Sequence, residues 1–295
     1  MTGASAAQDT AAGVLESARA PAEVALDCLD EVWAESANEW LLLSEACASC
    51  RPQRLGAGRG GRPAQDPRLK GGAERGGGQV CVWVDPLDGT KEFTQERFEF
   101  VSVLVGVTLR GRPVAGVIAE PYYRYYSPGP DGAAPATLPA GDPSRVLWGC
   151  ALPGVGAHVL GEPGWRAGRG GAGRGVVITS RSRTAGRTLE ALERLQARGV
   201  ATAALQAGGA GHKMARVIDG AADVWLMPIA GTSKWDTCAG EAVLAAAGGA
   251  VADAAGGALR YDPDGSMLNS EGVIAACSQR LLDAALDACR HHPAP

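Results

Sequence analysis

Two aspartates three residues apart, Asp85 and Asp88, lie where an apolar segment of the chain ends. The segment, residues 80–84, predicts a buried strand, and Pro86 and Gly89 then favour a turn. Carboxylates held on a rigid turn at a strand end can converge on one point. Hard cations such as Mg²⁺ prefer carboxylate and carbonyl oxygens, so this turn is a candidate metal site.

The neighbours of these aspartates offer further oxygen atoms. The carbonyl of Leu87 lies between them, and Thr90 follows with a hydroxyl that could hold a water molecule. The same residues also suit an ordinary solvated turn, because Asp-Gly is the commonest dipeptide of hairpin turns. On these residues alone, both interpretations stay open.

A third carboxylate, Asp236, lies far downstream, just where a helix is expected to begin, in the segment 234–241 that opens an apolar helix at residues 242–247. A side chain at this place often caps the helix. It could equally complete a two-metal cluster with Asp85 and Asp88.

The two motifs together, W-V-D-P-L-D-G-T at residues 83–90 and W-D-x-x-x-x-E at residues 235–241, resemble those of the lithium-sensitive, Mg²⁺-dependent phosphatases of the inositol monophosphatase superfamily. Further stretches are similar to its bisphosphate nucleotidase branch: residues 85–94, 116–123, 148–156, 179–182, 208–213, 234–238 and 267–272. The resemblance covers roughly residues 80–290.

The resemblance implies a metal site with two or three Mg²⁺ ions. Asp85 would bridge two ions, and Thr90 would position the attacking water. The implied ligands are Glu16, Asp85, the carbonyl of Leu87, Asp88 and Asp236. Glu16 lies at the distance that matches the family's upstream glutamate, although the neighbouring glycine and second acid of that motif are missing.

The resemblance also implies a substrate and the residues that bind it. The substrate is adenosine 3′,5′-bisphosphate, hydrolysed to AMP and phosphate, with 3′-phosphoadenosine 5′-phosphosulfate as a second substrate. Arg183 stands where the family usually has histidine. The glycines at residues 208–211 precede an expected helix at residues 214–218, whose backbone N–H groups could cradle a phosphate. The implied binding residues are Gly89, Thr90, Ser180, Arg183, Gly209 and Lys213.

The implied fold is the layered α/β sandwich of inositol monophosphatase and fructose-1,6-bisphosphatase. We expect an antiparallel-sheet lobe at residues 14–160, with a flexible basic loop at residues 51–78, and an α/β lobe at residues 176–295. In the family, two helices and a hairpin precede the upstream glutamate and supply an aspartate that pairs with the motif threonine. This chain is expected to lack that segment.

Local patterns predict individual elements. Residues 110–113 favour a hairpin turn, and residues 146–150 and 157–160 favour a further hairpin. Residues 188–196 predict a helix with Leu189, Leu192 and Leu195 on one face.

Composition limits the classes of partner. The 295-residue chain is 46% hydrophobic and carries a net charge of −4, which favours neither nucleic acid nor an anionic membrane as a partner. No apolar run approaches the length of a membrane span. The 8 cysteines are scattered, which predicts reduced thiols and a cytoplasmic protein; the C-x-x-C at residues 47–50 lacks further zinc ligands. The oligomeric state is not predicted.

Two alternatives to the nucleotidase remain. One is an inositol phosphate phosphatase of the same superfamily. The other is a protein that binds metal and nucleotide but turns over poorly, because the upstream aspartate is absent.

Overall fold

The structure is a computed structural model that describes residues 80–123, 144–151, 156–159 and 175–290. Several predictions from the sequence fall outside these ranges. They are the metal ligand Glu16 with its helix, the basic loop at residues 51–78, the C-x-x-C at residues 47–50 and most of the linker at residues 161–175.

A five-stranded antiparallel sheet forms the first layer, with the strands side by side in chain order. They are β1 (Val80–Asp88), β2 (Ser102–Leu109), β3 (Arg112–Glu120), β4 (Arg145–Cys150) and β5 (Gly156–Val159). The short helix α3 (Thr90–Phe93) and the 3₁₀ turn η2 (Phe98–Phe100) connect β1 to β2. The predicted hairpins are present; Arg110 and Gly111, both at positive φ, make the turn between β2 and β3.

Strand β1 differs from its prediction in two ways. It continues through the Asp-Pro-Leu-Asp motif to Asp88, and its pairing with β2 becomes irregular between Asp85 and Asp88. It is also buried on one side only: Trp83 is in the core, whereas Val82 and Val84 are 47% and 51% exposed. Strand β1 is the edge of this sheet, so part of its apolar surface has no neighbour among the described strands.

The second sheet is mixed and has the order β7-β6-β8-β10-β9. Strand β6 (Val176–Ser180) runs parallel to β7 (Ala203–Ala207) and β8 (Val224–Met227). Strand β10 (Val273–Ala276) is antiparallel to β8 and to β9 (Ala250–Ala252).

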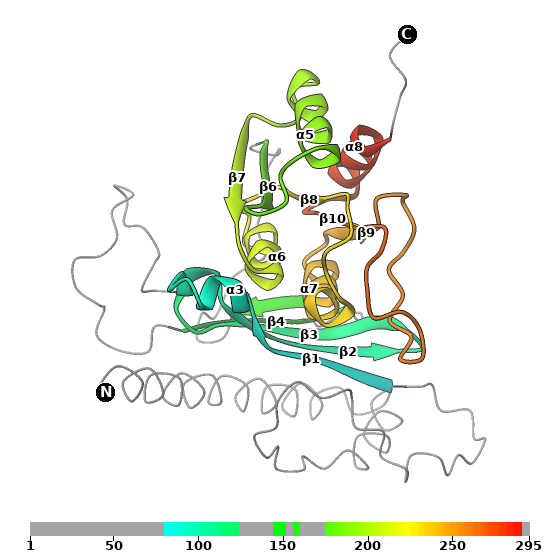
Figure 1. Ribbon diagram of the computed structural model, residues 1–295. Helices are drawn as coiled ribbons and strands as arrows, with labels where there is room; N and C mark the ends of the chain where they lie inside the picture. Colours follow the sequence, from blue (N-terminus) through cyan, green and yellow to red (C-terminus); the bar gives the residue numbers. More distant parts are fainter. Residues whose placement is uncertain (1–79, 124–143, 152–155, 160–174, 291–295) are drawn as a thin grey trace, which may run out of the picture.

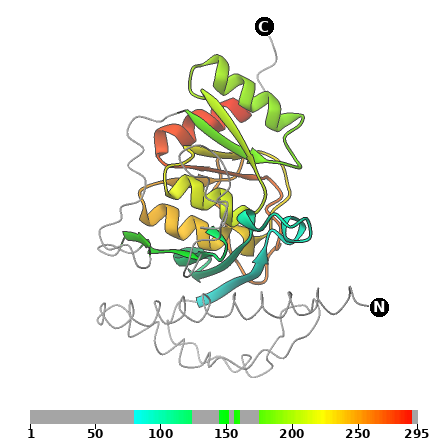
Figure 2. The same cartoon turned by 90° about the vertical axis from the view of Figure 1, so that its left-hand side faces the viewer.

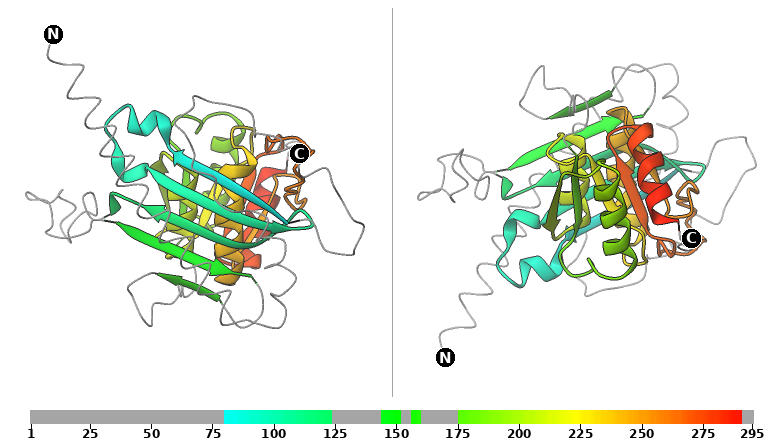
Figure 3. Two further views of the ribbon diagram at one scale, coloured as in Figure 1. Left: turned by 90° about the horizontal axis from the view of Figure 1, so that it is seen from below. Right: turned by 90° about the horizontal axis from the view of Figure 1, so that it is seen from above.

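Helices α6 (Ala210–Ile218) and α7 (Lys234–Ala246) lie between the two sheets and contact strands of both. Helices α5 (Arg187–Ala197) and α8 (Gln279–Cys289) pair on the outer face of the second sheet. The layers are visible in Figures 1 and 2, and Figure 3 shows the first sheet lying across α6 and α7. The predicted layered α/β arrangement is confirmed.

Close packing of α7 on the first sheet depends on two glycines. A Cβ atom at Gly106 would lie 2.5 Å from the Cys238 sulfur, and one at Gly116 would lie 2.3 Å from the Ala239 carbonyl oxygen. The helix can therefore approach the sheet directly, which brings its first turn beside the end of β1.

The predicted start of a helix at Asp236 is confirmed within two residues, because α7 begins at Lys234. Two other helix predictions need correction. Helix α6 begins at Ala210, so four residues of the expected glycine loop form its first turn. On α5, Leu192 and Leu195 are buried but Leu189 is 42% exposed, because Thr188 and Ala191 take the inner positions.

Two predictions from composition can be compared with the described residues. The cysteines within them form no disulfide bond with one another. None of the described helices combines the length and apolarity that crossing a membrane requires.

Candidate active site

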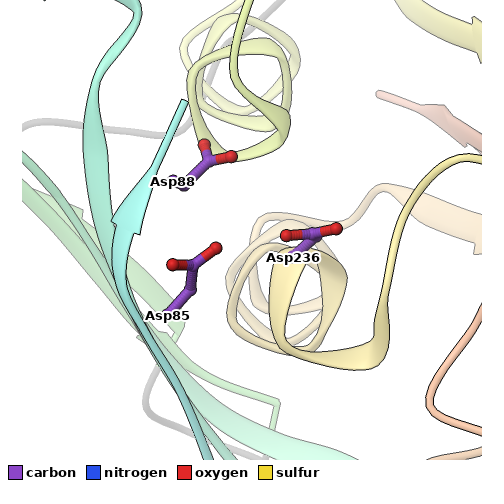
Figure 4. Close-up of side chains that lie close together, drawn as sticks. All are labelled: Asp85, Asp88 and Asp236. Carbon is purple, nitrogen blue, oxygen red and sulfur yellow. The ribbon is translucent and has the colours of Figure 1, made fainter. Parts of the chain in front are cut away.

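Three aspartate carboxylates meet between the first sheet and α7. Asp85 and Asp88 come from the end of β1, and Asp236 comes from the first turn of α7 (Figure 4). One carboxylate oxygen from each lies within 4.8 Å of those of the other two. The two sequence motifs therefore converge on one point, as their residue types suggested.

The β1 turn is held by its own hydrogen bonds. The backbone N–H of Leu87 donates to Asp85 Oδ1 at 3.0 Å, and the Thr90 hydroxyl donates to the Leu87 carbonyl at 3.0 Å. Asp85 is thereby oriented by the turn itself. The Leu87 carbonyl keeps one lone pair, and the Thr90 oxygen can still accept a hydrogen bond.

Asp236 is the third residue of α7, and the N-cap residue of this helix is Ser233. Its Oδ2 accepts the backbone N–H of Ser233 at 2.6 Å, which with the Ser233 side chain completes a capping box. The capping role proposed from the sequence and a place in the acidic cluster are therefore compatible, because Oδ1 has no part in the cap.

Asp88 has the densest set of donors in the cluster. Its Oδ1 accepts the N–H of Ala210 at 3.0 Å, and its Oδ2 accepts the N–H of Gly211 at 2.8 Å and the Ser102 hydroxyl at 2.7 Å. The expected phosphate cradle at the start of α6 thus needs correction. Two of its N–H groups already bind Asp88, so a phosphate cannot use them.

The pKa values of two of these three acids are raised, mainly by burial. Burial is the main cause of the raised pKa of Asp85, and the charge of Asp88 adds to it. Burial also raises the pKa of Asp236 to about 7, with further contributions from the charges of Asp88 and Asp85. A divalent cation would remove this repulsion, and three carboxylates beside a backbone carbonyl form a donor set that suits Mg²⁺.

A cleft of about 400 Å³ opens beside the cluster. It lies between the end of β1 with α3 on one side and loops of the second sheet's half of the chain on the other. Eight residues predicted from the sequence line it: Asp88, Gly89, Thr90, Ser180, Arg183, Gly209, Lys213 and Asp236. Asp85 and Leu87 adjoin it through the β1 turn, and Glu16 lies outside the described residues.

Three cationic residues line this cleft, Lys91, Arg183 and Lys213, and two of them have described partners. Lys213 is buried, donates to the carbonyl of Gly209 and lies with its Nζ 5.4 Å from the centre of the Trp225 ring. Burial lowers the pKa of Lys213 to about 8. Arg183 donates to the carbonyl of Gly231 at 3.0 Å, and the rest of its guanidinium group can contact a ligand.

One ion pair of the cleft was not predicted. Glu92 of α3 accepts a hydrogen bond at 2.9 Å from Arg181, which follows β6, so the pair joins the two halves of the chain. A Cβ atom at Gly208 would lie 2.2 Å from the Glu92 side chain, which shows how closely the α6 loop approaches α3. Neither residue carries a local sequence signal, because their pairing arises only when the two sheets come together.

A second buried network lies behind α7. The hydroxyl of Tyr261 donates to Glu241 Oε2 at 2.6 Å and lies 3.2 Å from the hydroxyl of Thr237. Burial raises the pKa of Glu241 to about 7. In the motif W-D-x-x-x-x-E, the aspartate therefore lies at the cleft and the glutamate lies in the core.

The fold and the acidic cluster together define a layered α/β protein with a carboxylate site suited to divalent cations. The chain belongs to the inositol monophosphatase family, whose sequence profile matches residues 45–293.

The relatives include proteins named for each of the two activities weighed from the sequence. A mouse protein named 3′(2′),5′-bisphosphate nucleotidase 1 is 37% identical over 197 residues, which are 67% of this chain and 57% of that protein. Zebrafish inositol monophosphatase 3 is 30% identical over 183 residues, 60% of this chain and 45% of that protein. The chain thus spans about half the length of the curated relatives it matches.

The fold comparison agrees with the sequence comparison. The solved structure of an inositol monophosphatase from Zymomonas mobilis matches with a TM-score of 0.53 at 19% identity, over 71% of this chain and 70% of that chain. This likeness concerns the fold.

Proposed function

We propose that this chain is a Mg²⁺-dependent phosphomonoesterase that hydrolyses adenosine 3′,5′-bisphosphate to AMP and phosphate. The observation that carries the proposal is the convergence of Asp85, Asp88 and Asp236 at the wall of a cleft that also contains Lys213 and Arg183. A site of this kind suits a ligand that is itself a polyanion.

The metal would be held by Asp85, Asp88, Asp236 and the carbonyl of Leu87, with Glu16 as a further predicted ligand. When bound, Mg²⁺ polarises a phosphoryl oxygen and lowers the pKa of a bound water. The hydrogen bonds to Asp88 from α6 and from Ser102 keep that carboxylate in place. The capping box does the same for Asp236.

Thr90 has a defined part in this scheme. Its hydrogen is donated to the Leu87 carbonyl, so its oxygen is left as an acceptor toward the cleft. A water that donates one hydrogen to Thr90 is oriented with a lone pair free for attack on phosphorus. Thr90 therefore acts as a positioning residue for the nucleophilic water rather than as a base.

The substrate proposal uses the cations and loops of the second half. The cleft is lined by Lys213 and Gly209 from the start of α6 and by Ser180 and Arg183 from the end of β6 and the loop after it. The name of the mouse relative gives the nucleotide as the first choice. The phosphosulfate analogue of this nucleotide is the second substrate that we propose.

The inositol phosphate alternative is supported by the zebrafish relative. We distinguish the two by measuring phosphate release from adenosine 3′,5′-bisphosphate, its phosphosulfate analogue and inositol 1-phosphate in Mg²⁺. A higher kcat/KM for the nucleotides supports the proposal, and a higher value for inositol phosphate contradicts its substrate. Tight nucleotide binding without phosphate release would instead indicate a binding protein.

A variant gives the same experiment a structural control. Lys213→Met should raise KM for the nucleotide at least about tenfold, because one charge-assisted contact contributes about 1.5–3 kcal/mol. Arg198→Met, at the exposed end of α5, should leave KM unchanged.

The cytoplasmic location expected from the cysteines stays a prediction.

A further inference from the structure

The three cationic side chains of the cleft differ in how they are held. Lys213 is buried and donates to the carbonyl of Gly209, and Arg183 donates to the carbonyl of Gly231 at 3.0 Å. Lys91 of α3 is exposed, and in the part of the chain that the structure describes its ammonium group has neither an ion pair nor a hydrogen bond. Its three N–H donors are therefore free for a ligand in the cleft.

The backbone that carries Lys91 is fixed by the residues on both sides of it. The Thr90 hydroxyl donates to the Leu87 carbonyl at 3.0 Å, and the buried carboxylate of Glu92 accepts a hydrogen bond from Arg181 at 2.9 Å. Thr90, Lys91 and Glu92 all line the cleft. Lys91 therefore has a fixed Cα position at the cleft and a flexible side chain that can adjust to a ligand.

The residues that line the cleft lie at different depths. Asp88 of the acidic cluster and Lys213 are buried, whereas Lys91 and Arg183 are exposed. The two exposed cations come from opposite sides of the cleft, one from α3 and the other from the loop after β6. A ligand with one group at the acidic cluster would therefore meet Lys91 with the part that extends toward solvent.

The proposed substrate has two phosphate groups, and only one of them can lie at the metal site during hydrolysis. The other phosphate is stabilised by charge-assisted hydrogen bonds from the cations of the cleft. The charge of Lys213 is opposed by the carboxylates of Asp88, Glu92 and Asp236, so it is partly offset before a ligand arrives. Lys91 is the cation of the cleft whose donors are not yet used.

We propose that Lys91 is a specificity-determining residue, whose ammonium group binds the phosphate that is not hydrolysed. This inference rests on the proposed phosphatase function and extends it, because it names a residue that separates nucleotide bisphosphates from monophosphates. Inositol 1-phosphate has no second anionic group, so a contact of this kind favours the nucleotide over the inositol phosphate.

The kinetic test compares adenosine 3′,5′-bisphosphate with adenosine 3′-monophosphate, which lacks the second phosphate. Lys91→Met should lower kcat/KM for the bisphosphate at least about tenfold, or about 1.4 kcal/mol, and leave the value for the monophosphate unchanged. Lys91→Arg keeps the charge and should retain most of the activity on the bisphosphate. Arg280→Met, which removes one positive charge from an exposed position of α8, is the matched control and should alter neither value. An equal loss on both substrates, or no loss on the bisphosphate, would overturn the proposal.

A binding measurement separates this inference from the proposed reaction. AMP, the expected product, keeps the second phosphate and needs no hydrolysis to report on it. Isothermal titration calorimetry in EDTA should show AMP binding by the unmodified protein and by Arg280→Met, and binding at least about tenfold weaker by Lys91→Met. This result would support the role of Lys91 even if no substrate released phosphate, which would contradict the proposed function alone. No AMP binding by the unmodified protein, or equal binding by Lys91→Met, would overturn the inference.

Discussion

The carboxylate of Asp88 accepts the backbone N–H of Gly211 at 2.8 Å, which joins the end of β1 to the start of α6. A carboxylate at a helix N-terminus satisfies N–H groups that have no partner within the helix and lies at the positive end of its dipole. The same carboxylate belongs to the acidic cluster. The acidic cluster and the packing of α6 on the first sheet therefore share one residue.

The support of Asp88 by Ser102 gives the first prediction. Ser102→Ala removes a buried 2.7 Å hydrogen bond to Asp88 Oδ2. We expect a loss of about 1–2 kcal/mol in the free energy of unfolding and a loss of about tenfold in Mg²⁺ affinity. Urea unfolding and a Mg²⁺ titration measure the two effects. Ser266→Ala, at an exposed hydroxyl, is the control; equal behaviour of the two variants would contradict the role given to Ser102.

The approach of α6 to the first sheet gives the second prediction. Gly209 has φ +58°, and a Cβ atom there would lie 2.2 Å from the Phe100 carbonyl oxygen. Gly199 also has a positive φ, +70°, but faces open space. Gly199→Ala should cost about 1–2 kcal/mol of backbone strain, and Gly209→Ala at least about 2 kcal/mol more because of the clash. Equal losses in denaturant unfolding would show that the loop can move away freely.

The buried Glu241 gives a prediction about pH. Burial raises its pKa from 4.5 to about 7, so the folded protein keeps a proton that the unfolded chain has lost. Its contribution to stability is present below pH 4.5 and is lost as the pH rises through 7. Glu241→Gln keeps the group neutral and should be more stable than the unmodified protein at pH 8, by up to about 3 kcal/mol. The difference should vanish at pH 4.

The control for this pH profile is Glu190→Gln on the exposed face of α5, where the carboxylate is half exposed beside Arg194. Thermal unfolding of both variants between pH 4 and pH 8 checks the prediction. A difference between Glu241→Gln and the unmodified protein that does not change with pH would mean that Glu241 is charged throughout.

The sequence predicted the convergence of the three aspartates well, because strand ends and helix starts are local features that place carboxylates without knowledge of the whole fold. The hairpin at Arg110 and Gly111 was predicted for the same reason. Errors arose where tertiary contacts determine which side chains are buried. The exposure of Leu189 depends on which face α5 presents to α8, and periodicity alone does not specify it.

The hydrogen bonds between the part of the chain that forms the first sheet and the part that forms the second could not be predicted from the sequence. Asp88 is 122 positions from Ala210, and Glu92 is 89 positions from Arg181. A pattern search finds residue types but gives no distance between segments so far apart. For this reason the sequence did not reveal that two of the α6 N–H groups, those of Ala210 and Gly211, bind Asp88 of β1; phosphate binding by the rest of this loop stays a prediction.

The most direct measurement is phosphate release from adenosine 3′,5′-bisphosphate as a function of Mg²⁺ concentration, for the unmodified protein, Asp85→Asn and Asp262→Asn. We predict no release in EDTA, Mg²⁺-dependent release by the unmodified protein and by the surface control Asp262→Asn, and a loss of about a hundredfold in Asp85→Asn. Undiminished release in EDTA or in Asp85→Asn would contradict the metal site, and no release by the folded protein would contradict the enzyme.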